Sequence, residues 1–410
     1  MTTFLEFAGL RYNLDKVTLN EVIAPPYDVV DGDERARLIG QSPYNSIRIE
    51  LPVEEPGIPG DRYEVAKSLL DSWIQTGVLA RDTSRCFYGY SMTYLDESGN
   101  RRSTSGVLGG LAVKGRATGD IMPHEETMPK PKGDRLFLLR STRTNLSPIW
   151  GLSLASGLTK AIEHDPERDG EQAVAVDEDG TEHRIWAIVA PERVAKISEI
   201  VGSGRVVIAD GHHRFETSLA FNEEDNSSNQ PGGGSGAVFG LIVELVPDQL
   251  LVRPIHRVVS GLGQGVDPIK ALEGHFALEP CEIDPARLTP QYLEEKQAIA
   301  LVTRAGVWLA RDRSMANAGK IGGGVLGELD SVILRNALEG LGDHEITYEA
   351  NWALAMGHLQ KDLADLVIMI RPVTVDQISR AAHEGVRMPP KTTYFFPKPR
   401  TGMVFRPLDD

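Results

Sequence analysis

Residues 206–217 read VVIADGHHRFET, and this stretch decides the expected fold. The run 205–209 is short and rich in β-branched residues, which predicts a buried strand. Asp210 follows it, Gly211 permits a tight turn, and a helix is expected to open at His212. A strand that passes through a glycine turn into a helix is typical of α/β proteins, so the chain is predicted to have a mixed α/β (α+β) fold.

The same turn predicts an anion-binding site. Free backbone N–H groups at a helix N-terminus attract phosphate, and Gly211 lets the backbone come close to it. Arg214 can hold phosphate oxygens with two N–H groups, and Asp210 is a candidate Mg²⁺ ligand beside the same phosphates. One alternative is that Asp210 only caps the helix while His212 and His213 are packed or solvated. Zinc is disfavoured because consecutive histidines point apart on a helix.

Strand and helix patterns alternate along the rest of the chain. Helices are expected at residues 61–77, 191–201, 329–338 and 375–383, and strands at 87–95, 237–246, 298–304, 307–311 and 365–370. Residues 222–236, NEEDNSSNQPGGGSG, are predicted to form a flexible surface loop. The boundary between two lobes is placed at this loop, which gives domains over residues 1–225 and 237–410.

Composition narrows the class of protein. The 410 residues include 43 Lys+Arg and 58 Asp+Glu, a formal charge of −15, which disfavours a nucleic-acid binding surface. Only two cysteines, Cys86 and Cys281, are present, so a disulfide framework is excluded and a reducing, cytoplasmic location is expected. No stretch approaches the roughly 20 apolar residues that span a bilayer, so no membrane association is expected.

Residues 122–135, MPHEETMPKPKGDR, are predicted to form a rigid active-site loop. His124 and Glu125 are candidate acid/base groups, and Lys130, Lys132 and Arg135 would supply positive charge to a polyanionic ligand. The loop is not a zinc-protease motif, because a methionine stands where the second histidine is needed and prolines replace the helix. A solvated, charged loop is the alternative.

Two proline-rich segments are further candidates for a binding surface, because proline lowers the entropy cost of ordering. Residues 24–30, APPYDVV, would present Tyr27 and Asp28 to a substrate. Residues 388–402, MPPKTTYFFPKPRTG, would present Lys391, Thr392, Lys398 and Arg400, with Lys391 and Lys398 as candidates for phosphate oxygens and Thr392 for the substrate. Structural anchoring of the two chain ends is the alternative. The run GGGVLG at 322–327 has dinucleotide-motif spacing, but no buried strand precedes it.

Five segments in order, APPYDVV, HEETMPKPKGDRL, ADGHHRFETSLA, RPIHRVV and MPPKTTYFFPKPRTG, resemble the family called domain of unknown function 1015. The resemblance runs from about residue 7 to residue 405. The DGHHR box is also similar to the phosphate-binding box of the ParB/sulfiredoxin superfamily, which includes free-serine kinases. The resemblance implies a ParB/sulfiredoxin-like catalytic core in residues 1–225 with an additional α/β lobe.

The resemblance also implies an activity. The chain is expected to phosphorylate free L-serine to O-phospho-L-serine with Mg²⁺ and with pyrophosphate or a nucleotide as donor. It implies donor binding by residues 210–214 and proton removal from the serine hydroxyl by a glutamate, for which Glu125 is the first candidate and Glu126 the second. The alternatives are a ParB-like nucleic-acid-associated regulator or nuclease, which the charge disfavours, and a non-catalytic sensor of a phosphorylated metabolite.

Overall fold

The computed structural model describes residues 2–116, 119–125, 133–225, 234–313 and 324–409. The chain forms two compact units. Unit 1 contains Met1–Pro123, Thr127–Leu250 and Pro397–Asp410, and unit 2 contains His124–Glu126 and Leu251–Phe396. Both units combine helices with sheets, so the predicted mixed α/β class is confirmed.

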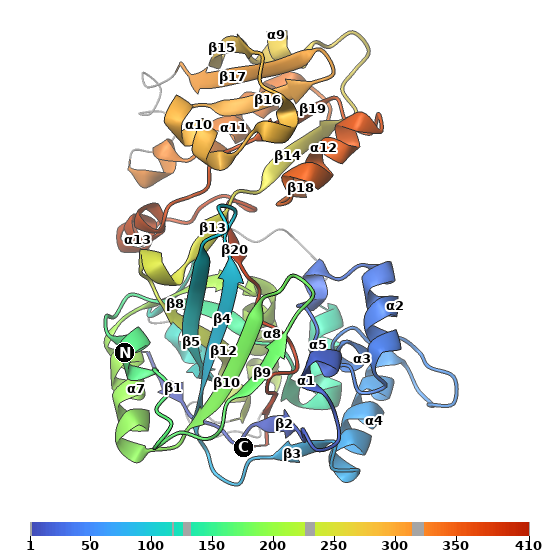
Figure 1. The fold of residues 1–410 in the computed structure, drawn as a ribbon, viewed down its shortest axis with the longest axis vertical. Coiled ribbons are helices and arrows are strands. Elements are labelled where there is room, and N and C mark those ends of the chain that lie inside the picture. The colour runs from blue at the N-terminus through green and yellow to red at the C-terminus, as the bar shows by residue number, and fades with distance from the viewer. Residues whose placement is uncertain (1, 117–118, 126–132, 226–233, 314–323, 410) are drawn as a thin grey trace. The chain divides into compact units, whose positions relative to one another are not determined.

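Unit 1 is built on a mixed sheet with the strand order β6-β11-β8-β12-β5-β4-β10-β9, with β1 beside β5 (Figure 1). The strands are β1 (Phe4–Leu5), β4 (Phe87–Leu95), β5 (Arg101–Ala112), β6 (Ile121–Pro123), β8 (Ile149–Ser153), β9 (Ala173–Val176), β10 (Glu182–Ile188), β11 (Val206–Asp210) and β12 (Ala237–Glu244). Strand β11 runs parallel to β6 and antiparallel to β8. It is therefore paired on both sides, which explains its apolar sequence.

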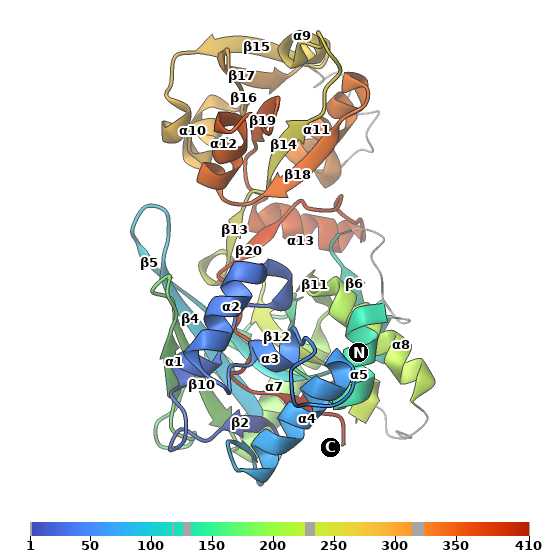
Figure 2. The ribbon, with the colours of Figure 1, turned by 90° about the vertical axis from the view of Figure 1, so that its right-hand side faces the viewer.

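Helices of unit 1 lie on both sides of this sheet. They are α1 (Leu19–Val22), α2 (Gly32–Gln41), α3 (Ile47–Glu50), α4 (Arg62–Gln75), α5 (Gly133–Thr142), α6 (Leu158–Ala161), α7 (Pro191–Ser203) and α8 (His212–Glu224). Helices α2 to α5 lie together on one side of the sheet in Figures 1 and 2. The small pairs β2 (Leu10–Tyr12) with β3 (Leu79–Arg81), and β7 (Thr144–Asn145) with β21 (Arg406–Pro407), complete the unit.

The core of unit 1 lies between the sheet and helices α7 and α8. Phe4 stacks on Phe87 with 5.0 Å between ring centroids, and Ile197 and Val201 of α7 and Phe215 of α8 pack into the same cluster. The end of β11 and the first turn of α8 thus pack on an apolar core, which holds the polar side chains between them in fixed positions.

Unit 2 is a second sheet, of order β15-β17-β16-β19-β14-β18, with helices on both faces (Figure 2). Its strands are β14 (His256–Ser260), β15 (Phe276–Cys281), β16 (Ile299–Thr303), β17 (Gly306–Asp312), β18 (Glu345–Glu349) and β19 (Leu366–Met369), with the pair β13 (Leu251–Arg253) and β20 (Tyr394–Phe396) beside them. Its helices are α9 (Pro268–Leu272), α10 (Pro290–Lys296), α11 (Asp330–Leu338), α12 (Trp352–Gln360) and α13 (Val375–Glu384).

Alternate residues of the unit 2 strands face opposite layers. Val367 packs with α10 and α12, whereas its neighbours Leu366 and Ile368 pack with α9 and α11. Because both faces are covered, the strand reads as a continuous apolar run rather than as an alternating one.

The division of the chain differs from the expected one at residues 225 and 237. Strand β12 lies between β8 and β5 inside the sheet of unit 1, so the first unit continues to Leu250. The final residues also return to unit 1, where Arg406 Nη1 donates to Asn145 Oδ1 at 3.0 Å and to the Ala237 carbonyl at 2.9 Å. The expected loop begins later than predicted, because residues 222–224 end α8, and residues 226–233 lie outside the described part.

Among the described residues, no helix is both long and apolar enough to cross a membrane.

Candidate functional site

The turn from β11 into α8 has the predicted geometry. Gly211 is the N-cap residue and has a left-handed backbone, with φ of 83°. A β-carbon at this position would lie 3.1 Å from Arg214 Nε and 3.1 Å from Ile149 Cα. Glycine is therefore required here for its backbone conformation and for the close approach of the neighbouring strand.

Asp210 is paired with two cations rather than used as a helix cap. Its Oδ2 accepts from Arg214 Nη2 at 2.9 Å, and its Oδ1 is bound by Lys398 Nζ. Burial alone would raise the pKa of Asp210, but the charges of Lys398 and Arg214 outweigh it and hold that pKa well below its usual range. Because Gly211 takes the cap position, the capping interpretation of Asp210 is wrong.

Arg214 is buried and fixed at both ends of its guanidinium. Its side chain is 9% exposed, Nη2 contacts Asp210, and Nη1 donates to the Pro148 carbonyl. His212 and His213 are half-buried in the first turn of α8, as the sequence predicts. One carboxylate, two cations and a helix N-terminus leave a net positive site, which suits a phosphate-containing anion.

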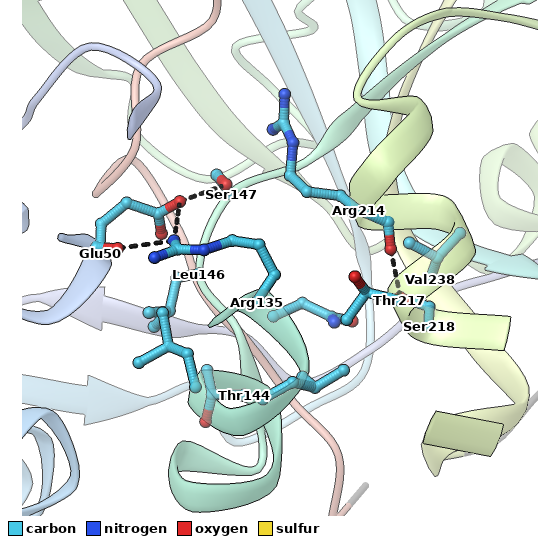
Figure 3. A pocket seen from close by; sticks show the side chains of 12 residues that line it. Glu50, Arg135, Thr144, Leu146, Ser147, Arg214, Thr217, Ser218 and Val238 are labelled. Carbon is cyan, nitrogen blue, oxygen red and sulfur yellow. Dashed lines mark hydrogen bonds and ion pairs between the residues drawn. The ribbon is translucent and has the colours of Figure 1, made fainter. Parts of the chain in front are cut away.

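A cavity of about 50 Å³ lies beside Arg214, between α5 and α8 (Figure 3). Arg135 and the buried Glu50 line one side of it, and Thr217 and Ser218 of α8 line the other. The Ser147 hydroxyl donates to Glu50 Oε1 at 2.9 Å. This volume is far below the roughly 300–1,000 Å³ of small-molecule pockets, so the cavity has room for water and not for a nucleotide.

Arg135, Tyr27 and Asp28 lie in the same region of unit 1. Arg135 Nη1 donates to the Glu50 carbonyl at 2.7 Å, and its guanidinium lies 4.2 Å from the centroid of the Tyr27 ring. Burial raises the pKa of Tyr27, partly opposed by the charge of Arg214. The charges of Asp210 and Asp28 raise the pKa of Arg214 against the effect of burial. The Tyr27 ring of the APPYDVV segment thus lies against Arg135, whose guanidinium is also engaged by Glu50.

Unit 2 contains a second cluster, around Glu125. The carboxylate accepts backbone N–H bonds from Lys391 at 3.0 Å, Thr392 at 3.1 Å and Thr393 at 2.8 Å, and a hydroxyl bond from Thr393 at 2.8 Å. His124 Nε2 lies 3.1 Å from Glu125 Oε1 and 2.6 Å from Thr393 Oγ1. Lys391 has a left-handed backbone, with φ of 60°, which helps consecutive N–H groups converge on one anion.

These contacts keep Glu125 ionised. Burial would raise its pKa, but the charge and hydrogen bond of His124 and the hydrogen bonds of Thr393 outweigh burial and lower the pKa to about 2. A carboxylate with so low a pKa accepts a proton poorly at neutral pH. In this arrangement Glu125 therefore anchors the segment 391–393.

Lys391 and Thr392 both contact Glu125 through their backbone N–H groups. The side chain of Lys391 is exposed, and its backbone N–H is the group that contacts Glu125. The Thr392 hydroxyl points into unit 2, where it donates to the Pro389 carbonyl at 2.7 Å and lies 3.1 Å from Ser331 Oγ. Lys398, the other lysine of the segment, lies in unit 1, where its side chain is bound to Asp210 Oδ1.

Sequence reasoning missed Thr393 and Glu50. Thr393 stands inside the MPPKTT segment already singled out, so its neighbours were a signal for it. Glu50 has no local motif, and only its burial and its contacts with Ser147 and Arg135 reveal it. Lys130, Lys132 and Glu126 lie outside the described residues.

The donor set at Asp210 suits Mg²⁺ only in company with phosphates. In the described ranges no group of three or more His, Cys, Asp or Glu side chains could hold a metal ion. Mg²⁺ is commonly bound by one or two carboxylates together with substrate phosphates and water. The single carboxylate of Asp210, at a site that attracts phosphate, fits that arrangement.

Comparison with solved structures finds weak likenesses over most of the chain. A conserved hypothetical protein from Pyrococcus furiosus is 15% identical, with a TM-score of 0.38, covering 74% of this chain and 96% of that one. A free serine kinase in complex with AMP is 15% identical, with a TM-score of 0.37, covering 74% and 89%. SbnI with a C-terminal truncation, from Staphylococcus aureus, is 13% identical, with a TM-score of 0.37, covering 72% and 85%.

Comparison with families gives a clearer result. No curated protein matches the chain. The family model described as "Protein of unknown function (DUF1015)" matches residues 4–332, which is more than half of the chain and includes both the β11–α8 turn and Glu125. The resemblance noted from the five sequence segments is thereby confirmed, and the chain belongs to the DUF1015 family.

Proposed function

We propose that this protein transfers a phosphoryl group from pyrophosphate, or from a nucleotide, to the hydroxyl of free L-serine with the help of Mg²⁺. The observation that carries the proposal is the partly buried Asp210 held between Lys398 and Arg214 at the N-terminus of α8. Serine as acceptor follows from the similarity of the DGHHR box to that of the free-serine kinases.

The proposed reaction is a direct transfer of the phosphoryl group, without a covalent intermediate on the protein. The serine hydroxyl oxygen attacks the terminal phosphorus of pyrophosphate, and the bond from that phosphorus to the bridging oxygen breaks with its electron pair. The hydroxyl proton leaves to a base and ends on the orthophosphate product. Such a transfer needs positioning and charge stabilisation more than a nucleophile, which agrees with a site made of Arg, Lys and one carboxylate.

Arg214 and Lys398 have complementary tasks in this scheme. The planar guanidinium of Arg214 is already fixed by Asp210 and Pro148, so it can hold a phosphate in one orientation. Lys398 carries a compact charge on a flexible stem, which can move from Asp210 onto a phosphate oxygen when the donor binds. The freed oxygen of Asp210 would then hold Mg²⁺, which supplies charge neutralisation for the phosphates.

Glu125 remains our proposed base, under one condition. Its five hydrogen-bond contacts favour the ionised form, so it must lose part of them when serine binds before its pKa rises toward neutrality.

The test is phosphorus NMR of the purified protein with serine, Mg²⁺ and, in turn, pyrophosphate, ADP and ATP. We expect a phosphoserine signal with at least one donor, and its loss with EDTA. Asp210→Asn keeps the shape of the side chain but removes the charge that pairs Arg214 with Lys398, and should lower the rate by at least 100-fold, as expected when transition-state charge stabilisation is lost.

A matched control is Asp169→Asn, which removes a buried carboxylate of unit 1 that pairs with Arg193 and stands in neither cluster. Its rate should stay close to that of the wild type once folding is verified by circular dichroism. Donor binding without any phosphoserine would instead establish a sensor and refute the kinase proposal.

A further inference from the structure

Four residues of unit 1 form a closed ring of hydrogen bonds next to Lys398. The Arg400 backbone N–H donates to Tyr90 Oη at 3.1 Å, and Tyr90 Oη lies 2.7 Å from His183 Nδ1. His183 Nε2 lies 3.0 Å from Asp177 Oδ2, which also accepts from Arg400 Nε at 3.1 Å and from its Nη2. The ring begins at the backbone of Arg400 and ends on the side chain of the same residue.

The proton positions in the ring follow from its geometry. Because the Tyr90 oxygen accepts the Arg400 N–H, its own proton is available for His183 Nδ1. A neutral imidazole that accepts at Nδ1 carries its proton on Nε2, which therefore donates to Asp177. Burial lowers the pKa of His183 despite the opposing effect of Asp177, in agreement with a neutral ring. All these contacts are compatible with a single arrangement of protons.

The ring is buried and supported by the central sheet. Tyr90 and His183 are 1% and 0% exposed and come from the adjacent strands β4 and β10, while Asp177 directly follows β9. Their partner, Arg400, has a side chain that is 13% exposed. A hydrogen-bonded network in a buried environment is strong and admits little movement, so it fixes Arg400 relative to the sheet.

Lys398 is two residues from Arg400 in the run Pro397-Lys398-Pro399-Arg400. Each proline locks its own φ and restricts the residue before it, so the run has few backbone conformations. The backbone of Thr401, on the other side of Arg400, is bonded in both directions to Ala24. A rotation or shift of Arg400 is therefore transmitted to Lys398 rather than absorbed between them.

We infer that Asp177, His183 and Tyr90 are positioning residues, which hold Lys398 against Asp210 and so prepare the phosphate site for its donor. The expected effect on donor binding rests on the proposed function, whereas the expected placement of Lys398 does not. None of the three residues contacts Asp210 or Arg214 in the hydrogen bonds described above, so their effect on donor binding passes through Lys398.

The placement of Lys398 is tested first, without any donor. The full-length protein is dimethylated with ¹³C-formaldehyde at its lysines, and the Lys398 signal is assigned by its loss in Lys398→Arg. We expect Asp177→Asn to move this signal toward the position of exposed lysines. Tyr90→Phe opens the ring at another bond by removing only a hydroxyl, and should move the signal in the same direction.

A matched control exists in the same unit. Asp82 accepts from Arg11 Nε at 2.8 Å and from the Tyr88 hydroxyl at 2.5 Å, and Tyr88 Oη accepts the Gly9 backbone N–H at 2.8 Å. Asp82→Asn therefore alters another network of an aspartate, a tyrosine, an arginine and a backbone N–H, one without a histidine, and should leave the Lys398 signal in place. A Lys398 signal unmoved by both ring variants, or moved equally by the control, overturns the inference.

The consequence is tested by calorimetry with pyrophosphate as the probe. Asp177→Asn should weaken pyrophosphate binding about fivefold, within the coupling range of residues linked through a hydrogen-bond network or a backbone shift, and should have no further effect in a Lys398→Ala background. An undiminished effect in that background would show that the ring does not act through Lys398. If the wild type does not bind pyrophosphate, pyrophosphate is excluded as the donor of the proposed reaction. The Lys398 signal still tests the inference in that case.

Discussion

At the scale of single residues, Glu125 shows how contacts decide a chemical role. A glutamate beside a histidine in a polar loop is a natural candidate for a base, yet its carboxylate accepts bonds from three successive backbone N–H groups and one hydroxyl. Those bonds make it a firm anchor in the absence of substrate. Its activity as a base therefore depends on whether serine binding removes some of them.

The substitution Glu125→Gln separates the two roles. Glutamine keeps the size and one acceptor oxygen but cannot take a proton, so we expect kcat for phosphoserine formation to fall by about 10²–10⁴ with a small change in the KM for the donor. Steady-state kinetics measure both constants. Glu279→Gln, at an exposed glutamate of unit 2 paired with Arg311, is the control and should change neither. A kcat within twofold of the wild type would leave Glu125 as an anchor only.

At the scale of elements, the helices and strands with strong local sequence patterns lie close to their predicted positions. The strand expected at residues 87–95 is β4, and the helix expected at 61–77 is α4, whose N-terminus has the capping box formed by Asp61 and Glu64. The expected strand at 205–209 and the helix after it are β11 and α8. Caps, alternation and turn residues act within a few positions, so a single sequence contains them.

The C-terminal segment is an element whose placement depends on distant partners. Arg406 is 3% exposed and donates to Asn145, to the Ala237 carbonyl at 2.9 Å and to the Gly234 carbonyl at 2.9 Å. We expect Arg406→Lys to lower the free energy of unfolding of unit 1 by about 2–3 kcal/mol, because an ammonium cannot reach the same three acceptors.

Urea unfolding followed by tryptophan fluorescence measures this loss. Arg311→Lys is the matched control, since Arg311 is half-exposed and its ion pair with Glu279 should contribute less than about 1 kcal/mol. Equal losses in the two variants would mean that the C-terminal segment contributes little to the stability of unit 1.

At the scale of the whole molecule, the carboxylates with lowered pKa values predict acid instability. Burial is outweighed at Glu125, Asp210 and Asp177 by neighbouring cations and hydrogen bonds, so each has a folded-state pKa below its ordinary value. A group of this kind contributes stability above its unfolded pKa and loses it as pH falls through the folded pKa. For Glu125, from 4.5 to about 2, the contribution is about 3 kcal/mol.

We therefore expect the melting temperature to be steady from pH 7 to about pH 5 and to fall between about pH 4.5 and pH 2. Differential scanning calorimetry across this range measures it. In Glu125→Gln, the decrease in the melting temperature of unit 2 on acidification should be smaller than in the wild type. A wild-type melting temperature that rises on acidification would contradict the assignment of these ion pairs.

The sequence by itself determined the mixed α/β class, the family and the turn at Asp210 and Gly211, because each depends on neighbouring residues or on ordered motifs. Only the tertiary structure decided that β12 and residues 397–410 belong to unit 1. It alone also showed that Lys398 meets Asp210, and that Lys391, Thr392 and Thr393 hold Glu125. Those pairings join residues 188 to 268 positions apart, and such distant contacts follow from how the sheets pair and close, which no local pattern contains.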